Sequence, residues 1–229
     1  MPALLCKREE EYKVEIAGII VRYLYTFFDS FSFLVLAALG LATIFGMMKI
    51  VNQAHGEFIM LGAVIFSLVT TNGLPFIIGL IAATAGVALF GFILDRLIIS
   101  RLYDRPMDSI VVTWGFSLAM VQFMRLKFGS VIASTGIPLG SISFAGSVYS
   151  VYKIILIVIA ILLLFGFYFV FARTKFGLYA RATMQKPDIA KSMGVNTNFN
   201  YSVTFMIGSG LAGLCGALYA PTMNVTPDM

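Results

Sequence analysis

Charged residues are spaced unevenly along this chain, so that long uncharged windows alternate with short polar stretches. A helix needs about 20 mostly apolar residues to cross roughly 30 Å of hydrocarbon. The uncharged windows reach 16 to 37 residues, and the longest contains Thr-Thr-Asn-Gly-Leu-Pro at 70–75, a sequence typical of a turn. The pattern predicts six membrane-spanning helices, at about residues 31–48, 56–71, 75–95, 109–125, 152–172 and 202–220.

Apolar and polar residues do not alternate with period two along these windows, which argues against a β-barrel. The expected fold is all-α: a polytopic membrane bundle of about six helices, some of them broken. We expect residues 1–29 to form a charged or interfacial segment and residues 30–229 to form the membrane domain. Residues 14–28 fit either a helix at the membrane surface or a short extra span, because Glu15 and Arg22 interrupt their apolar pattern.

Composition supports a membrane protein and removes other classes. Hydrophobic residues make up 59% of the 229 residues and charged residues 12%, about half the charged share of a soluble domain. The chain is too apolar for a soluble fold or for disorder. Its net charge is +5, but its basic residues do not cluster into a face of the kind that binds nucleic acid. Two cysteines and one histidine exclude a Cys- or His-based metal cluster within this chain, and no nucleotide-binding loop or nucleophile elbow occurs. We therefore expect no metal, no cofactor and no catalytic residue.

Lysine and arginine are distributed unequally between the connecting segments. Nine of them lie at Lys49 or in segments 96–108 and 173–201, and three lie in the segments on the other side. Cytoplasmic loops carry the excess of Lys and Arg. Segments 96–108 and 173–201 are therefore expected in the cytoplasm, in a multi-pass protein of the plasma or inner membrane.

The segment between the first two predicted spans, Lys49-Ile-Val-Asn-Gln-Ala-His-Gly-Glu57, carries a strong polar signal. Residues 58–70 cover only about 20 Å as a helix, too little for roughly 30 Å of hydrocarbon, so part of the segment is expected at membrane depth. Irregular polar backbone occurs there only inside protein or along a cavity, and broken helices mark substrate paths in transporters. An interfacial turn that caps two helix ends explains the same residues equally well. The candidate path residues are Asn52, Gln53, His55, Gly56 and Glu57.

A second polar group lies in the predicted helix that Pro106 and Asp108 open. Its tryptophan, Trp114, is of the type that anchors helices at the membrane interface. Alternatively, Thr113, Trp114 and Ser117 are candidates to line a polar path.

The basic segment 173–194 is predicted to contain a short helix at about 187–193. Pro187 suits its first position, Asp188 its first turn and Gly194 the residue after its end. Ile189 and Met193 share one face because they are four residues apart. A helix of two turns is not stable alone in water, so it needs a partner, either the lipid headgroups or a soluble protein into which it inserts.

Gly208-Ser-Gly-Leu-Ala-Gly213 has the spacing of a dinucleotide-binding loop, but it lies in an apolar run with no acidic residue about 20 positions later. Small residues every four positions instead let membrane helices approach closely. The expected packing positions are Gly208, Ala212, Gly213 and Gly216.

Taken in order, these motifs resemble the membrane permeases of ABC transporters for branched-chain amino acids and urea. Residues 40–63, with Asn-Gln-Ala-His-Gly-Glu at their centre, resemble the first hairpin of that family. Phe176-Gly-Leu-Tyr-Ala-Arg-Ala182 followed by Ala190-Lys-Ser-Met-Gly-Val195 resembles its loop that docks on the ATPase subunit. Within the family, Arg105-Pro-Met-Asp-Ser-Ile-Val-Val-Thr-Trp-Gly115 is closer to the urea permease, and Gln185 also fits that branch. The resemblance covers about 35–220 and leaves out the charged N-terminal tail.

The resemblance implies the permease subunit of an ATP-driven importer, with urea or a related small amide as substrate and branched-chain amino acids as the alternative. The implied partners, within the lipid bilayer and without nucleic acid, are a second related permease chain, two ATPase subunits and an extracytoplasmic substrate-binding protein. Family members continue with further helices, so we expect this chain to be C-terminally incomplete. The implied ATPase-coupling residues are Phe176, Gly177, Arg181, Ala182, Pro187, Asp188, Ile189, Ala190, Met193 and Gly194.

Two other classes compete with this reading. A stand-alone channel or secondary transporter for a small polar solute has no use for a docking helix on its cytoplasmic side. A non-transporting membrane scaffold has no use for a costly intramembrane His-Gly-Glu sequence.

Overall fold

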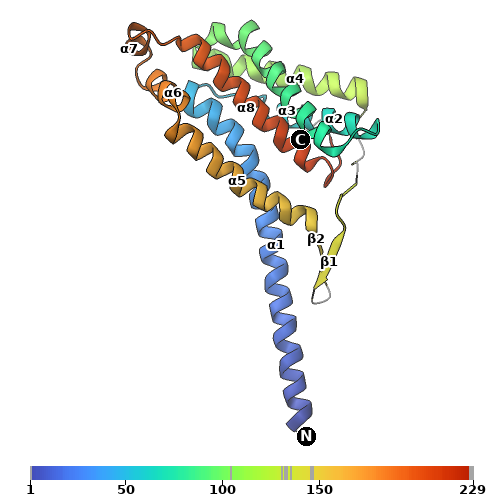
Figure 1. Cartoon of the computed structure of the whole chain (residues 1–229). Helices are drawn as coiled ribbons and strands as arrows, with labels where there is room; N and C mark the ends of the chain where they lie inside the picture. Colours follow the sequence, from blue (N-terminus) through green and yellow to red (C-terminus); the bar gives the residue numbers. More distant parts are fainter. Residues whose placement is uncertain are drawn as a thin grey trace.

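The computed structural model describes residues 2–103, 105–129, 131, 134, 136–144 and 147–226, with side chains from residue 15 onward. It is a helical bundle with one short β-hairpin (Figure 1). In chain order the elements are α1 (Pro2–Met48), α2 (His55–Thr71), α3 (Phe76–Leu97), the 3-10 helix η1 (Ile99–Leu102), α4 (Pro106–Phe128), β1 (Ser141–Phe144), β2 (Ser147–Ser150), α5 (Val151–Arg173), α6 (Lys175–Gln185), α7 (Pro187–Ser192) and α8 (Thr197–Tyr219).

Five helices in the described part of the chain are long and apolar enough to cross a membrane: α1, α3, α4, α5 and α8. The sixth predicted span, α2, is apolar but has only 17 residues, which is about 25 Å of helix. The prediction of a polytopic helical membrane bundle is confirmed. The predicted bounds of α2 to α5 agree with the structure to within three residues at each end.

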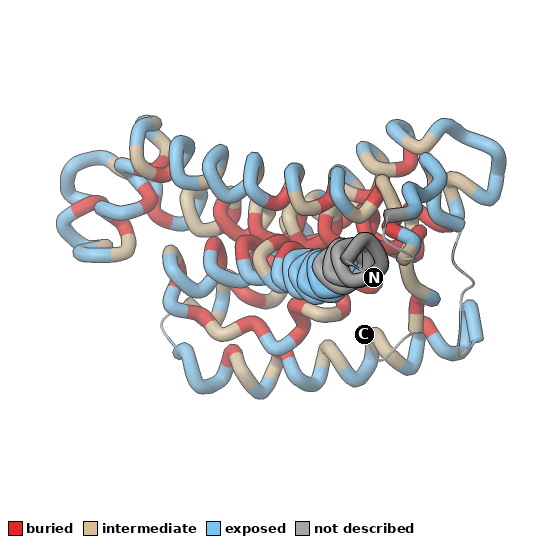
Figure 2. Tube along the Cα trace, turned by 90° about the horizontal axis from the view of Figure 1, so that it is seen from below, coloured by how far each residue is buried: buried red, intermediate tan, exposed pale blue. Residues whose placement is uncertain are grey.

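Helix α8 forms the centre of the bundle and packs against α1, α2 and α3. Figure 2 shows the buried residues gathered in the middle of the molecule, while the outward faces of the surrounding helices are exposed. Small residues make this packing possible. A Cβ atom at Gly216 would meet the backbone carbonyl oxygen of Ile59 on α2, and one at Gly213 would lie 2.6 Å from Cβ of Val87 on α3. The expected role of these glycines in helix packing agrees with these close approaches.

Helix α1 is a single helix of 47 residues, about 70 Å long. It runs unbroken through position 30, where the sequence analysis placed the boundary between a separate segment and the membrane domain. The sequence offers a physical reason, because no proline occurs between Pro2 and Pro75 and a few charged residues do not end a helix. The apolar part of α1 among the residues with described side chains, Glu15–Met48, is 34 residues long, which is more than the roughly 20 residues that a span requires.

The β-hairpin and the helices η1 and α6 were not predicted. Strands β1 and β2 pair antiparallel, with Ser141 opposite Ser150 and Phe144 opposite Ser147. Ser-Ile-Ser-Phe alternates polar and apolar residues over only four positions, outside the predicted spans, so the hairpin does not change the all-α architecture. Helix α6 was also missed, although Thr174 marks its start by accepting a hydrogen bond from the Gly177 N–H at 3.3 Å.

At the end of the bundle near the β-hairpin, a polar cluster joins three helices. Lys153 Nζ on α5 lies 2.5 Å from a carboxylate oxygen of Asp29 on α1. The Tyr219 hydroxyl on α8 donates to the Asp29 carbonyl at 3.2 Å and lies 2.6 Å from the Ser32 hydroxyl. This cluster holds α1, α5 and α8 together at the end of the bundle opposite α7. Segments 96–108 and 173–201 gather at the end where α7 lies (Figure 1).

Candidate functional site

The chain turns sharply at the end of α1 and returns beside the same helix. Lys49 adopts a left-handed backbone conformation with φ of 56°, and α2 begins only at His55. The His55 Nε2 atom lies 3.0 Å from the carbonyl oxygen of Ala37, which is about three helical turns, or roughly 16 Å, before the end of α1 at Met48. The segment 49–54 therefore runs back along α1 before the next helix starts.

Helix α4 gives a second, independent measure of how far the start of α2 lies from the end of α1. The Ser117 hydroxyl donates a hydrogen bond to Oε1 of Glu57, and Ser117 lies about three turns, roughly 16 Å, after the start of α4 at Pro106. Met48 and Pro106 line the same polar groove, so the two helix ends are at a similar level. Both measures place the first turn of α2 about 16 Å from these helix ends, a distance of about half of roughly 30 Å of hydrocarbon.

The hairpin 49–57 is held by its own polar groups and by α4. Asn52 is only 3% exposed, and its Oδ1 accepts a hydrogen bond from the Ala54 N–H at 3.1 Å. The Gln53 N–H donates to the Thr113 hydroxyl at 3.1 Å. Gly56 is partly buried, and the Gln53 residue itself is exposed. The structure thus brings all five predicted hairpin residues and Thr113 together.

Three buried polar atoms of the hairpin have no hydrogen-bond partner among the described residues: Asn52 Nδ2, His55 Nδ1 and Glu57 Oε2. Leaving a buried polar group unpaired costs about 1–3 kcal/mol, and ionisable side chains inside a membrane mark functional sites by default. One amide donor, one ring nitrogen and one carboxylate oxygen are therefore available here to a ligand or to another chain.

The close approach of α1 and α8 packs tightly against the ring of His55. A Cβ atom at Gly40 on α1 would lie 2.8 Å from Cε1 of His55 and 2.7 Å from the carbonyl oxygen of Gly208 on α8. Gly208 is equally restricted by Ile44, and the neighbouring Ala212 is fully buried. Gly40 and Ala37 were not predicted as site residues. The sequence feature that could have indicated them is the spacing of small residues on α1. This spacing becomes informative only once α8 is known to pack against α1.

The second predicted polar group is divided by the structure. Thr113 is buried, and its hydroxyl also donates to the Ser109 carbonyl oxygen at 2.8 Å. Trp114 is 60% exposed on another side of α4, because adjacent residues in a helix point about 100° apart. Ser117 is one turn beyond Thr113 and reaches Glu57, so Thr113 and Ser117 face the hairpin and Trp114 does not share their buried side.

The predicted short helix is present as α7, and Pro187 occupies its first position. Gly194 has φ of +83°, and hydrogen bonds from Gly194 N to Lys191 O and from Val195 N to Ala190 O close the helix end. Ala190 is buried against the bundle, whereas Ile189 is 55% and Met193 80% exposed. Asp188, in the first turn, is exposed as well.

The remaining residues assigned to the cytoplasmic loop lie on α6. Gly177 is in close contact with the carbonyl group of Phe171, and the Phe176 ring packs edge-on against Phe171 at 5.8 Å. Arg181 and Ala182 are exposed, and Arg181 lines an apolar groove beside α5 instead of the face of α7. The loop therefore presents two separate surfaces, one on α7 and one on α6.

A buried carboxylate near this end of the bundle was missed. Asp95 in the last turn of α3 is fully buried, and the Tyr103 hydroxyl lies 2.8 Å from both of its carboxylate oxygens. Burial, reinforced by the Asp95 charge, raises the pKa of Tyr103 above its ordinary value, and its ring packs on Tyr201 of α8 at 4.8 Å. The available signal was an acidic residue at a helix C-terminus, where a negative charge is unfavourable unless something binds it.

The fold and the hairpin define a polytopic helical membrane protein with an irregular polar segment before α2. A family model described as the permease component of branched-chain amino acid transport systems matches residues 23–229. The chain belongs to this family.

Several curated proteins are similar to it. A high-affinity branched-chain amino acid transport permease, BraD of Pseudomonas aeruginosa, is 25% identical over 80% of this chain and 65% of its own length. A probable branched-chain amino acid permease, LivH of Methanocaldococcus jannaschii, is 26% identical over 85% of this chain and 64% of its own length. A guanosine ABC transporter permease, NupQ of Bacillus subtilis, is 28% identical over 64% of this chain and 49% of its own length.

The chain thus spans somewhat less than two thirds of the length of the first two relatives. No solved structure matches it. These relatives are transport permeases and not enzymes, in agreement with the prediction that the chain is not an enzyme. Neither the family model nor these relatives carry urea in their names, so the urea subtype predicted from 105–115 is not confirmed.

Proposed function

We propose that this chain is the permease subunit of an ABC importer and that the hairpin 49–57 borders its translocation path. The observation that carries the proposal is Glu57. Its carboxylate is buried, with one oxygen bound by Ser117 and the other without a partner among the described residues. A core-forming carboxylate would need both oxygens satisfied, whereas one beside a path can exchange a partner for a passing solute.

The substrate class we propose is a small aliphatic amino acid, the alternative that the names of the relatives favour over urea. Such a substrate is a zwitterion, so it needs an acceptor for its ammonium group and donors for its carboxylate. Glu57 Oε2 offers an acceptor and Asn52 Nδ2 a donor. The start of α2 adds a favourable field for a negative group, since half-helix N-termini point at substrate carboxylates in other transporters.

Helix α7 is the proposed link to ATP hydrolysis. Its buried Ala190 fixes it to the bundle, while the exposed Ile189 and Met193 present an apolar face at the cytoplasmic side. A helix of six residues is not stable on its own, and an ATPase groove would stabilise it by covering these side chains. Movement of the ATPase would then pass through α7 to α8, which begins directly after it.

The partners required by this proposal are a second related permease chain, two ATPase subunits and an extracytoplasmic binding protein. The broad exposed apolar faces of α4 and α5 in the described chain are available to lipid and to a second permease. A self-contained channel remains the competing class and is separated from the importer by energy dependence.

The test is uptake by proteoliposomes that contain the chain with its partner subunits and internal ATP. We expect ATP-dependent accumulation of radiolabelled leucine that excess valine inhibits and excess urea does not. Accumulation of labelled urea but not leucine would overturn the substrate class. Uptake that runs equally well without ATP would overturn the importer and favour a channel.

A further inference from the structure

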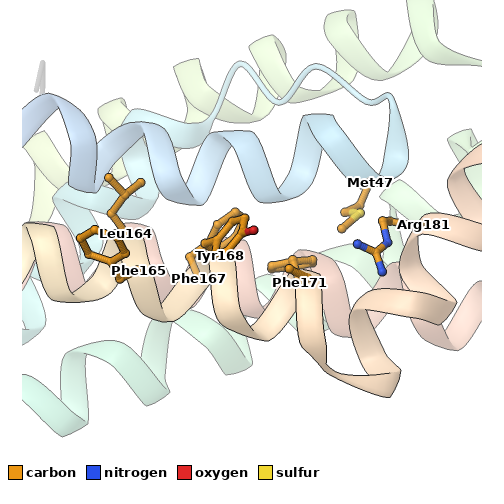
Figure 3. Close-up of a pocket in the computed structure, with 8 residues that line it drawn as sticks. Met47, Leu164, Phe165, Phe167, Tyr168, Phe171 and Arg181 are labelled. Atoms are coloured by element: carbon orange, nitrogen blue, oxygen red, sulfur yellow. The ribbon is translucent and has the colours of Figure 1, made fainter.

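An apolar groove runs between the C-terminal halves of α1 and α5 (Figure 3). It has a volume of about 580 Å³, within the range of roughly 300–1,000 Å³ that is typical of ligand sites. Met47 of α1 and aliphatic and aromatic side chains of α5, from Leu164 to Ala172, line it. One charged residue, Arg181 of α6, stands at one end, next to Met47 in Figure 3.

The position of the groove fixes which end faces water. Met47 lies one residue before the end of α1, and Ala172 one residue before the end of α5, so the Arg181 end lies at the cytoplasmic headgroup level. Leu164 lies about 12 Å deeper along α5. An occupant must therefore be apolar over most of its length and polar only where it meets Arg181.

The positive charge of Arg181 at the cytoplasmic end of the groove favours an occupant whose polar group is negatively charged. Arg181 is exposed and forms no ion pair within the described part of the chain. Arg173 and Lys175, both exposed, follow the last groove residue of α5 directly. Basic pockets between membrane helices on the cytoplasmic side bind anionic lipid headgroups, and a guanidinium binds phosphate oxygens in a bidentate geometry.

We propose that this groove binds an anionic phospholipid, with an acyl chain along α5 and the headgroup phosphate on Arg181. Tyr168, which is two-thirds exposed, also lines the groove, and amphipathic aromatic rings of this kind are enriched near a membrane interface. The site is separate from the hairpin 49–57 and does not depend on which solute is transported. It also reaches α6, which connects α5 to the docking helix α7.

The experiment is native mass spectrometry of the full chain in detergent, after addition of phosphatidylglycerol or of phosphatidylcholine with the same acyl chains. We compare the unaltered protein with Arg181→Gln, which removes the charge, and Ala172→Trp, which fills the groove. Lys186→Gln is the matched control, because it removes one exposed positive charge from the same surface and does not line the groove.

We expect one retained phosphatidylglycerol, held about fivefold more strongly than phosphatidylcholine, which corresponds to one basic contact. Arg181→Gln should abolish this preference, Ala172→Trp should remove the bound lipid of either kind, and Lys186→Gln should behave like the unaltered protein. Equal retention of both lipids, or retention that neither groove variant changes, would overturn the proposal. The same variants are co-purified with the partner subunits in a parallel experiment. Loss of that complex in Ala172→Trp without loss of lipid would also overturn the proposal, because the occupant of the groove would then be a protein.

Discussion

Ser117 on α4 donates a hydrogen bond to Glu57 at the start of α2, across 60 positions of sequence. Together with the bond from the Gln53 N–H to Thr113, it ties α4 to the hairpin 49–57. Helix α4 otherwise exposes most of its surface in the described chain. Any movement of α4 relative to the bundle must therefore change the surroundings of the Glu57 carboxylate.

The first prediction concerns the size and the charge of this side chain. Glu57→Gln keeps an oxygen acceptor for Ser117, so we expect a folded protein with a reduced uptake rate. Glu57→Ala leaves the Ser117 hydroxyl unpaired, at a cost of about 1–3 kcal/mol, and should lower the yield of folded protein as measured by size-exclusion chromatography.

Ser117→Ala provides the control for the pair. If the two side chains act together, the double variant Glu57→Ala/Ser117→Ala should be less destabilised than the sum of the single variants, by about 0.5–3 kcal/mol. Strict additivity of the unfolding free energies would contradict the coupling that the structure shows.

The second prediction concerns α7. Ile189→Asp or Met193→Asp introduces a carboxylate that would lose its hydration in an apolar docking groove, at a cost of several kcal/mol. We expect normal membrane insertion, with ATP hydrolysis no longer coupled to uptake. Ile189→Val and Met193→Leu keep the apolar face and should retain coupling. Full uptake by either aspartate variant, with the ATPase co-purifying at the usual ratio, would rule out this docking face.

The third prediction uses two glycines in membrane helices. A Cβ atom at Gly216 would overlap the Ile59 carbonyl oxygen, while one at Gly166 on α5 would meet nothing within 4 Å. Gly216→Ala should destabilise the protein by about 1–3 kcal/mol or more through overpacking. Gly166→Ala should be neutral or stabilising by up to about 1 kcal/mol. Thermal unfolding in detergent compares the two, and similar midpoints would contradict the packing of α8 against α2.

The fourth prediction concerns pH. The pKa of Tyr103 is raised in the folded protein, so its contribution to stability is complete below the unfolded value of about 10. It is lost as the pH rises from there toward the folded pKa. Tyr103→Phe should therefore lose stability at neutral pH, because Asp95 loses a donor, and should show a smaller further loss above pH 10 than the unaltered protein. Parallel stability curves from pH 8 to 11 would contradict this role.

The parts of the fold that sequence reasoning recovered are those set by local patterns. The uncharged windows located the spans because hydrocarbon tolerates few charges. Gly194 was predicted at the end of the short helix because a left-handed residue there favours glycine, and it has φ of +83°.

The parts that were missed depend on contacts between distant segments or on weak local signals. The charged residues within 15–48 permit either one helix or two, and only the absence of proline there favours the single helix that α1 forms. The bonds of Glu57 to Ser117 and of Tyr103 to Asp95 join residues on different elements, which no sequence spacing reveals. The β-hairpin, with strands of four residues, is too short for a pattern analysis to separate from a loop.

The most direct test of the central claim is the accessibility of the hairpin from the cytoplasm. In a background with Cys6→Ser and Cys215→Ala, single cysteines at Glu57 and at the exposed Lys186 are treated with a membrane-impermeant maleimide in inside-out vesicles. A hairpin about 16 Å below the surface predicts that Glu57→Cys reacts far more slowly than Lys186→Cys. Equal reaction rates at the two positions would show that Glu57 lies in bulk water, and the hairpin would then be only an interfacial turn.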